Sequence, residues 1–223
     1  MSESQVVAAK KCRIMIVDDH PIVRRGLSAL VRDEPDLEMC GEAESAPEAM
    51  ERLEEATPDL VVVDLTLKSG HGLKLVQDIK AKNDKIKILV SSMHDEMLFA
   101  ERVLRAGAMG YINKQGAPEK IIDAIRQVMR GEIYLSSRMA NRLLHRVSGD
   151  RLPEKSTVDR LTDRELQVFQ MIGQGLSTRE IAKDLELSRK TVETHREKIK
   201  AKLRLRNSSE LSRDATRWAM ENG

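Results

Sequence analysis

Residues that could carry out phosphoryl transfer follow short aliphatic runs in the first half of this sequence. Asp18 and Asp19 come directly after one such run, and Asp64 comes directly after another. Ser92 and Lys114 stand at the ends of two later runs. Three carboxylates in one pocket would repel one another, so the set predicts a divalent cation with oxygen ligands, most naturally Mg²⁺. A carboxylate nucleophile, a metal ion, a hydroxyl and an ammonium group are together the components of a phosphoryl-transfer site.

These side chains converge only if the aliphatic runs are strands of one parallel sheet. The runs 14–17 and 60–63 do not alternate between apolar and polar residues, which is typical of strands buried on both faces. Three further strands are predicted, at 37–40, 86–90 and 109–112. Amphipathic stretches predict helices between them, at 22–31, 47–55, 73–81, 98–106 and 118–129. The alternation predicts an α/β fold, a doubly wound five-stranded parallel sheet, in which the carboxyl ends of the strands share one edge.

Two other interpretations of the same polar residues have to be weighed. Any single one of the five could simply end its strand, but five of them at the ends of four strands favour one shared pocket. A Mg²⁺-dependent phosphatase or hydrolase could be built on the same sheet, yet it would need a substrate pocket and a second acid or base beside the nucleophile. The sequence indicates neither, so we expect a protein that is not an enzyme.

The first half resembles the receiver domain of two-component signalling proteins over residues 11–131. The stretches that carry the resemblance are Val17-Asp18-Asp19-His20-Pro21, Val63-Asp64-Leu65, Ser91-Ser92-Met93-His94-Asp95 and Gly110-Tyr111-Ile112-Asn113-Lys114. The resemblance implies that Asp64 accepts a phosphoryl group from a sensor histidine kinase. The implied Mg²⁺ ligands are the side chains of Asp18, Asp19 and Asp64 and the backbone carbonyl of Thr66. Lys114 would pair with the phosphoryl oxygens, and Ser92 would move toward them so that Tyr111, the switch aromatic, turns inward.

One stretch departs from the receiver pattern. Receivers commonly carry Met-Pro-Gly a few residues after the acceptor, where this sequence has Leu67-Lys68-Ser69-Gly70. The missing proline removes a rigid turn, and Lys68 brings a positive charge beside the pocket. We expect an effect on loop dynamics or on the phosphoryl lifetime. An alternative, a constitutive DNA-binding transcription factor with a vestigial receiver, stays open on this residue, although the intact pocket argues against it.

The last part of the chain predicts a small all-α domain of four helices, a helix-turn-helix. The residues that would cap the helix N-termini are Thr162 with Glu165, Ser177 with Glu180, Ser188, and Ser208. Between Arg189 and Arg206 there are eight basic residues and only two acidic ones. A short helix, a tight turn and a longer basic helix form the arrangement whose second helix enters the major groove of DNA.

This segment resembles the LuxR-type helix-turn-helix over nearly all of residues 160–221, and the two halves together resemble the NarL/FixJ subfamily of response regulators. The resemblance implies three residues at base edges, namely Glu193, Thr194 and Glu197. It implies five basic residues at phosphates, namely Arg189, Lys190, Arg196, Lys198 and Lys202. The implied partner is double-stranded promoter DNA, bound by a homodimer that forms on phosphorylation or on DNA.

The chain is therefore expected to have four segments. These are an N-terminal extension at 1–10, the receiver at 11–131, a helix and interdomain linker at 132–159, and the DNA-binding domain at 160–223. Aromatic residues make up only 2% of the chain, which argues against stacking on single-stranded nucleic acid. The two cysteines lack metal-ligand spacing and no apolar run is long enough for a membrane span, so we expect a cytoplasmic protein without a membrane partner.

Overall fold

The computed structural model of the protein describes residues 11–67, 71–116, 120–147, 157–185 and 187–222. The chain divides into two compact units, Met1–Ala140 and Asn141–Gly223. The predicted N-terminal extension, the Lys68-Ser69-Gly70 departure and most of the predicted linker lie outside the described residues. Among the residues that are described, no helix is both long enough and apolar enough to cross a membrane.

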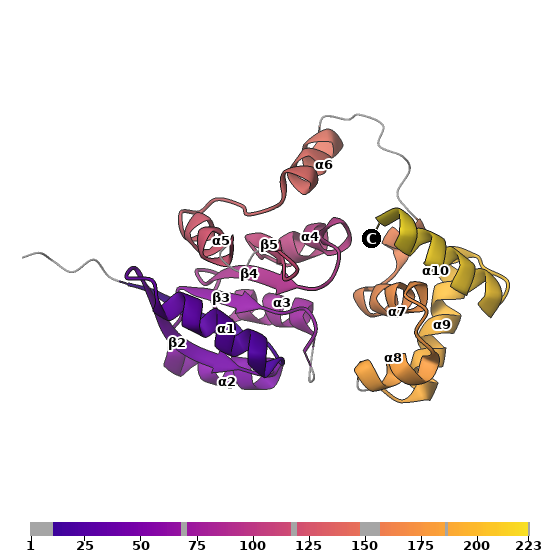
Figure 1. Ribbon diagram of the computed structural model, residues 1–223, viewed down its shortest axis with the longest axis horizontal. Coiled ribbons are helices and arrows are strands. Elements are labelled where there is room, and N and C mark those ends of the chain that lie inside the picture. The colour runs from indigo at the N-terminus through magenta and orange to yellow at the C-terminus, as the bar shows by residue number, and fades with distance from the viewer. Residues whose placement is uncertain (1–10, 68–70, 117–119, 148–156, 186, 223) are drawn as a thin grey trace, which may run out of the picture. The chain divides into compact units, whose positions relative to one another are not determined.

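The first unit is an α/β fold with one five-stranded sheet. Its strands are β1 (Cys12–Val17), β2 (Leu37–Ala43), β3 (Leu60–Val63), β4 (Lys87–Ser92) and β5 (Gly110–Asn113). Its helices are α1 (Pro21–Arg32), α2 (Ala46–Ala56), α3 (Gly72–Lys82), α4 (Glu96–Arg105) and α5 (Lys120–Met129). All strand pairs are parallel and the order is β2-β1-β3-β4-β5, so helices follow strands as a doubly wound sheet requires (Figure 1). The predicted fold class is confirmed.

The strand register brings the polar residues to one edge. Val17 of β1 pairs with Val63 of β3, and Val63 pairs in turn with Val90 of β4. The backbone N–H of Asp64 donates to the carbonyl of Val17 at 2.9 Å, which holds the ends of β1 and β3 at the same level. The two strands that carry the predicted carboxylates are therefore direct neighbours.

The aliphatic runs are buried as their lack of alternation predicts. All four residues of β3 are buried, and so are the last four of β1, because helices cover both faces of the sheet. Each such side chain contributes about 1.5–3 kcal/mol when it is removed from water. This core fixes the positions of the strand ends, and with them the positions of the site residues.

The first unit continues beyond the predicted end of the receiver at residue 131. Gly131 follows α5 with a φ of 88°, a left-handed conformation that favours glycine. The chain then runs along β5, where Tyr134 pairs with Gly110, before α6 (Ser137–Val147) begins. This pairing explains why the first compact unit extends to Ala140.

The second unit contains helices only among its described residues. They are the short 3₁₀ helix η1 (Thr157–Arg160), α7 (Asp163–Gly173), α8 (Thr178–Asp184), α9 (Arg189–Leu203) and α10 (Ser208–Asn222). Both capping boxes are present, at Thr162 and at Ser177, and Ser188 caps α9. The prediction for α10 was wrong by one residue. The Asn207 side chain, not that of Ser208, accepts the backbone N–H of Glu210 at 2.9 Å.

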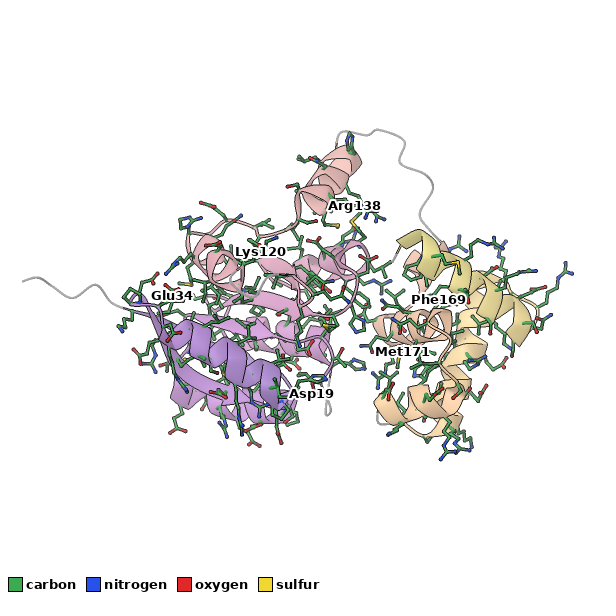
Figure 2. All side chains as sticks on the ribbon, viewed as in Figure 1. Asp19, Glu34, Lys120, Arg138, Phe169 and Met171 are labelled. Carbon is green, nitrogen blue, oxygen red and sulfur yellow. The ribbon has the colours of Figure 1, made fainter. Side chains whose placement is uncertain are left out.

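Close packing of α7 against α10 holds the second unit together. Phe169 of α7 and Trp218 of α10 have ring centroids 5.7 Å apart. A Cβ on Gly173 would lie 2.5 Å from the carbonyl oxygen of Ala215, so only glycine allows the two helices to approach this closely. Figure 2 labels Phe169 on α7.

Candidate functional site

Four side chains of the first unit form a cluster at the carboxyl edge of the sheet. Asp18, Asp19, His20 and Asp64 each offer a ligand atom, and these atoms all lie within 4.8 Å of one another. The three aspartates are buried, whereas His20 is exposed. Figure 2 shows Asp19 beside one end of α1, opposite Glu34 at the other end. Pro21 then starts α1 at once, which keeps the loop short.

Lys114 supplies the positive charge of this cluster. Its Nζ donates to Asp18 Oδ2 and to Asp64 Oδ2, both at 2.6 Å. Its side chain is almost completely buried, as are the two carboxylates that it joins. The predicted lysine, at the end of β5, therefore reaches across the sheet edge to the ends of β1 and β3. Among the residues that the structure describes, the Lys114 ammonium contacts two of the three carboxylates, so these groups together keep an excess of negative charge.

Burial controls the acidity of Asp64. It raises the pKa of this carboxyl from 3.8 to about 6, and the Lys114 ammonium opposes the rise only in part. The backbone N–H of Thr66 donates to Asp64 Oδ1 at 3.2 Å. At neutral pH the group is therefore ionised, but in a poorly solvated place where an added cation would stabilise it.

The donor set is suited to a metal ion with oxygen ligands. Asp19 Oδ1 is a buried atom without a hydrogen-bond donor in suitable geometry among the described residues, although His20 Nδ1 lies 2.7 Å away. A buried, unsatisfied carboxylate oxygen beside two further carboxylates is the arrangement that a divalent cation completes. The acidic cluster can thus hold a metal ion.

The predicted switch residues are linked to Lys114 through the backbone, because the N–H of Lys114 donates to the carbonyl of Ser92 at 2.9 Å. Ser92 is fully buried at the end of β4, and its Oγ accepts the backbone N–H of His94 at 3.3 Å. Tyr111 is also buried, and its hydroxyl donates to the carbonyl oxygen of His94 at 2.7 Å. The sequence interpretation has Tyr111 turn inward when Ser92 moves. In this conformation the ring is already inside, because the His94 carbonyl satisfies its hydroxyl.

Two residues of this region had no predicted role. His94 connects the site, since its Nε2 lies 3.0 Å from Thr66 Oγ1 and its ring stacks on Phe99 at 4.9 Å. Gly72 begins α3 against the acceptor, because a Cβ there would lie 2.1 Å from the carbonyl oxygen of Asp64. His94 lies within a stretch that carried the receiver resemblance, so its position was a usable signal. Nothing in the sequence pattern marked Gly72.

The candidate DNA-binding residues lie on α9 of the second unit. Six of them are exposed, namely Arg189, Lys190, Glu193, Thr194, Glu197 and Lys198. Buried Val192 and Ile199 fix the opposite face of the helix. Ser188 caps the N-terminus of α9, and the hydroxyl of Thr178, at the start of α8, donates to Glu193 Oε1 at 2.7 Å. The two helices of the predicted motif are thus joined at the residue that was predicted to read bases.

Two of the eight candidates are placed differently. The Nζ of Lys202 donates to Glu165 Oε2 at 2.5 Å, and this carboxylate is buried on α7. Lys202 therefore joins α9 to α7, and its predicted contact with a phosphate stays a prediction. The Arg196 side chain is only 12% exposed and lies 3.8 Å from Glu193, which limits its reach toward a phosphate. Spacing and charge alone could not separate these two residues from the exposed ones.

Arg164 is a residue of the second unit that the sequence did not single out. Its guanidinium donates to the carbonyl oxygen of Leu185 at 2.8 Å and to the Gln167 side chain at 2.9 Å. It thereby ties α7 to the end of α8. Near it, burial and the Arg164 charge lower the pKa of His195 below its usual range, so this histidine is neutral at pH 7.

Comparison with known proteins gives two family matches that together span most of the chain. Residues 14–126 match the response regulator receiver domain, and residues 159–215 match the bacterial regulatory proteins of the luxR family. The oxygen regulatory protein NreC of Staphylococcus carnosus is 35% identical over 204 residues, which cover 89% of this chain and 94% of NreC. The transcriptional regulatory protein LiaR of Bacillus subtilis is 35% identical over 196 residues, which cover 86% of this chain and 90% of LiaR.

Solved structures of RcsB match most of the chain. RcsB of Salmonella enterica serovar Typhimurium, bound to the promoter rprA in the presence of the phosphomimetic BeF3⁻, has a TM-score of 0.62 at 25% identity. That match covers 93% of this chain and 99% of RcsB. A second RcsB structure, from Salmonella typhimurium, has a TM-score of 0.65 at 26% identity and covers 93% of this chain and 98% of that one.

Proposed function

We propose that this chain, which belongs to the two-component response regulators that join a receiver to a LuxR-type DNA-binding domain, is switched by a phosphoryl group on Asp64. The family consists of DNA-binding transcription regulators, not enzymes. What the proposal adds is the assignment of individual residues, of Mg²⁺ as the metal, and of the partners.

One observation carries the phosphorylation proposal: the buried Asp64 carboxylate lies beside two further carboxylates and a buried ammonium group. Asp64 Oδ would form the bond to phosphorus as the donor's bond to that phosphorus breaks. Lys114 already lies 2.6 Å from Asp64 Oδ2, so its Nζ is placed to follow the negative charge onto the phosphoryl oxygens. Asp18, Asp19 and the Thr66 carbonyl are the proposed Mg²⁺ ligands beside Asp64, and the bound ion would neutralise part of the phosphoryl charge.

Mass spectrometry of the intact chain after treatment with acetyl phosphate and Mg²⁺ tests the acceptor. We expect the mass of one phosphoryl group on the wild type, stable in acid and lost in base, and none on Asp64→Asn. Asp78→Asn is the matched control, because Asp78 is a surface carboxylate on α3 paired with Lys74 at 2.6 Å. An adduct that persists in Asp64→Asn would assign the acceptor to another residue.

For the second unit we propose that α9 reads DNA with Glu193, Thr194 and Glu197 at base edges. A glutamate accepts a hydrogen bond from cytosine N4 in the major groove. Arg189, Lys190 and Lys198 are the proposed phosphate contacts on the same exposed surface, with Arg196 as a partly buried fourth.

Two variants separate base reading from phosphate binding in a DNA titration. Glu193→Ala should change which sequence is preferred. Lys198→Ala should weaken binding to every sequence. It should also reduce the slope of log affinity against log salt concentration by about 1. Lys183→Ala is the matched control, since it is an exposed lysine of α8 outside the proposed set. If Lys198→Ala and Lys183→Ala have the same effect, α9 does not carry the phosphate contacts.

The proposed partners are a sensor histidine kinase as phosphodonor, promoter DNA, and a second copy of the chain. Symmetric half-sites are read by symmetric dimers, so we expect sedimentation to show a dimer on DNA or after phosphorylation. The proposed location is the cytoplasm, where DNA and a kinase domain are both accessible. Equal DNA affinity with and without the phosphoryl group would favour the alternative of a constitutive DNA-binding factor with a vestigial receiver.

A further inference from the structure

The chain between α5 and α6 is fastened to the edge of the sheet. Residues 132–136 form this edge segment. The backbone N–H of Tyr134 donates to the carbonyl of Met109 at 3.0 Å, and the Tyr134 carbonyl accepts the backbone N–H of Tyr111 at 2.9 Å. The Gln127 side chain donates to the carbonyl of Ile133 at 2.8 Å. The segment thus continues the hydrogen bonding of the sheet by one short step beyond β5.

Glycine at position 110 makes this approach possible. A Cβ there would lie 3.0 Å from both the Cβ and the carbonyl oxygen of Tyr134, and 2.9 Å from Leu89 Cδ1. Cβ contacts of 3.0 Å are tighter than most in proteins, so a larger residue at position 110 would require the edge segment or the Leu89 side chain to shift. The close contact is built into the strand next to Tyr111.

A second fastening joins the edge segment to α4. The backbone N–H of Ser136 donates to Glu96 Oε1 at 2.8 Å, and Glu96 is the first residue of α4. Ser136 Oγ in turn accepts the backbone N–H of Met139 in the first turn of α6 at 3.2 Å. Met139 is buried. The start of α6 therefore depends on where α4 begins.

Both sets of hydrogen bonds are connected to the proposed switch residues. Tyr111 provides a backbone N–H to the edge segment, while its hydroxyl donates to the carbonyl of His94. Glu96 follows His94 by two residues, and the His94 backbone is held by Ser92 Oγ. A displacement of the loop between β4 and α4 would thus act on the edge segment at both of its attachment points.

We propose that Glu96 and Tyr134 are positioning residues, which hold the start of α6 against α4 and β5 in one conformation of Ser92 and Tyr111 and release it in another. This inference rests on the function proposed above. When Ser92 and the following loop move toward a phosphoryl group, Glu96 no longer reaches Ser136. The edge segment then separates from β5 and α6 is released. Since the chain passes from α6 toward the DNA-binding domain, the release changes the constraint on that domain.

Hydrogen exchange of the full-length chain tests the release directly. The amides of Tyr134, Ser136 and Met139 are followed before and after treatment with acetyl phosphate and Mg²⁺. We expect their exchange to increase roughly tenfold, the effect of losing one hydrogen bond for each amide, while the amides of β1 and β3 stay protected. A chain that carries the phosphoryl mass and keeps all three amides protected would overturn the inference. Absence of the adduct would contradict the function proposed above instead, and the variants below then decide the role of Glu96.

Two substitutions of Glu96 separate the hydrogen bond from the general effect of a charge at a helix N-terminus. Glu96→Ala removes the acceptor, whereas Glu96→Gln removes the charge and keeps an acceptor oxygen. We expect Glu96→Ala to raise the exchange of the Ser136 and Met139 amides without any phosphodonor, and to shift DNA affinity toward that of the phosphorylated chain. Glu96→Gln should restore the wild-type values. If both variants behave alike, or if neither changes these amides, Glu96 does not position α6.

Discussion

Replacing Asp64 with asparagine is expected to stabilise the first unit when no divalent cation is present. Burial raises the pKa of Asp64 from 3.8 to about 6 despite the nearby Lys114. The ionised carboxylate therefore costs about 3 kcal/mol of folding free energy above pH 6, at about 1.4 kcal/mol for each tenfold difference in acidity. Asparagine avoids that cost but still buries a polar amide, so about 3 kcal/mol is the upper limit of the gain.

The dependence on pH follows from the direction of the pKa shift. A folded pKa that is raised means that the stabilising contribution of Asp64 is fully present below about pH 4 and is lost as pH rises through about 6. The Asp64→Asn variant has no such loss. Its advantage over the wild type should therefore grow between about pH 4 and 6 and stay constant at higher pH.

Mg²⁺ should close the gap between the two proteins. A ligand at 100 times its dissociation constant adds about 2.7 kcal/mol to the folded state, and the variant gains less because it lacks one carboxylate ligand. Hydrogen exchange of the core amides in β1 and β3, in EDTA and in Mg²⁺, measures these differences for the first unit alone. Asp78→Asn should show no gain in either condition. A variant that is less stable than the wild type in EDTA at pH 7.5 would refute the reasoning, because the Lys114 pairing would then outweigh the burial.

Three further perturbations have defined outcomes. Lys202→Met should lower the free energy of unfolding of the second unit by about 1–3 kcal/mol, because it leaves the Glu165 carboxylate buried without its partner. Tryptophan fluorescence during urea unfolding measures this loss. An unchanged unfolding midpoint would contradict it. Gly72→Ala should slow labelling by acetyl phosphate at least about tenfold, because its Cβ would displace the Asp64 carbonyl; a wild-type rate would mean that the start of α3 yields instead. Burial raises the pKa of Cys12 to about 11, so about one molecule in a thousand carries its thiolate at pH 8. Alkylation of this cysteine, followed by peptide mass spectrometry, should be far slower in the native chain than in urea, and equal rates would show that the thiol is accessible.

The centre of the sheet was predictable because most residues of β1, β3 and β4 are buried and form aliphatic runs in the sequence. The boundaries were less so. The sequence interpretation ended the second strand at Cys40, whereas β2 continues to Ala43. The register with β1 shifts between Ile14 and Met15, and Gly41 lies opposite Met15 just beyond the shift. A glycine inside a strand often marks such an irregularity.

The acidic cluster was predictable for a topological reason, while the pairing of individual charges was not. Parallel strands place their carboxyl ends together, so residue type and position within each strand were sufficient to bring Asp18, Asp64 and Lys114 to one place. The partner of Lys202, by contrast, lies 37 positions earlier on another helix. No local pattern separates a lysine that meets a buried carboxylate from one that meets solvent or DNA. The pairing of Tyr134 with β5 is equally a product of tertiary contact.

Among the buried acidic groups of the described residues, Asp64 and Glu165 differ in how far neighbouring charges compensate them. Burial alone would raise the pKa of Glu165, but hydrogen bonds from Lys202 and Thr162 hold it below its usual range. Its charge is therefore compensated by the protein, and its ion pair with Lys202 links α7 to α9. Burial does raise the pKa of Asp64, because one ammonium group is shared among several carboxylates. A charge that the fold leaves incompletely compensated is where an added cation or phosphoryl group changes the free energy most. The opposite directions of the two pKa shifts support the proposal that the responsive site lies at the sheet edge, while Glu165 and Lys202 hold α7 and α9 together in the second unit.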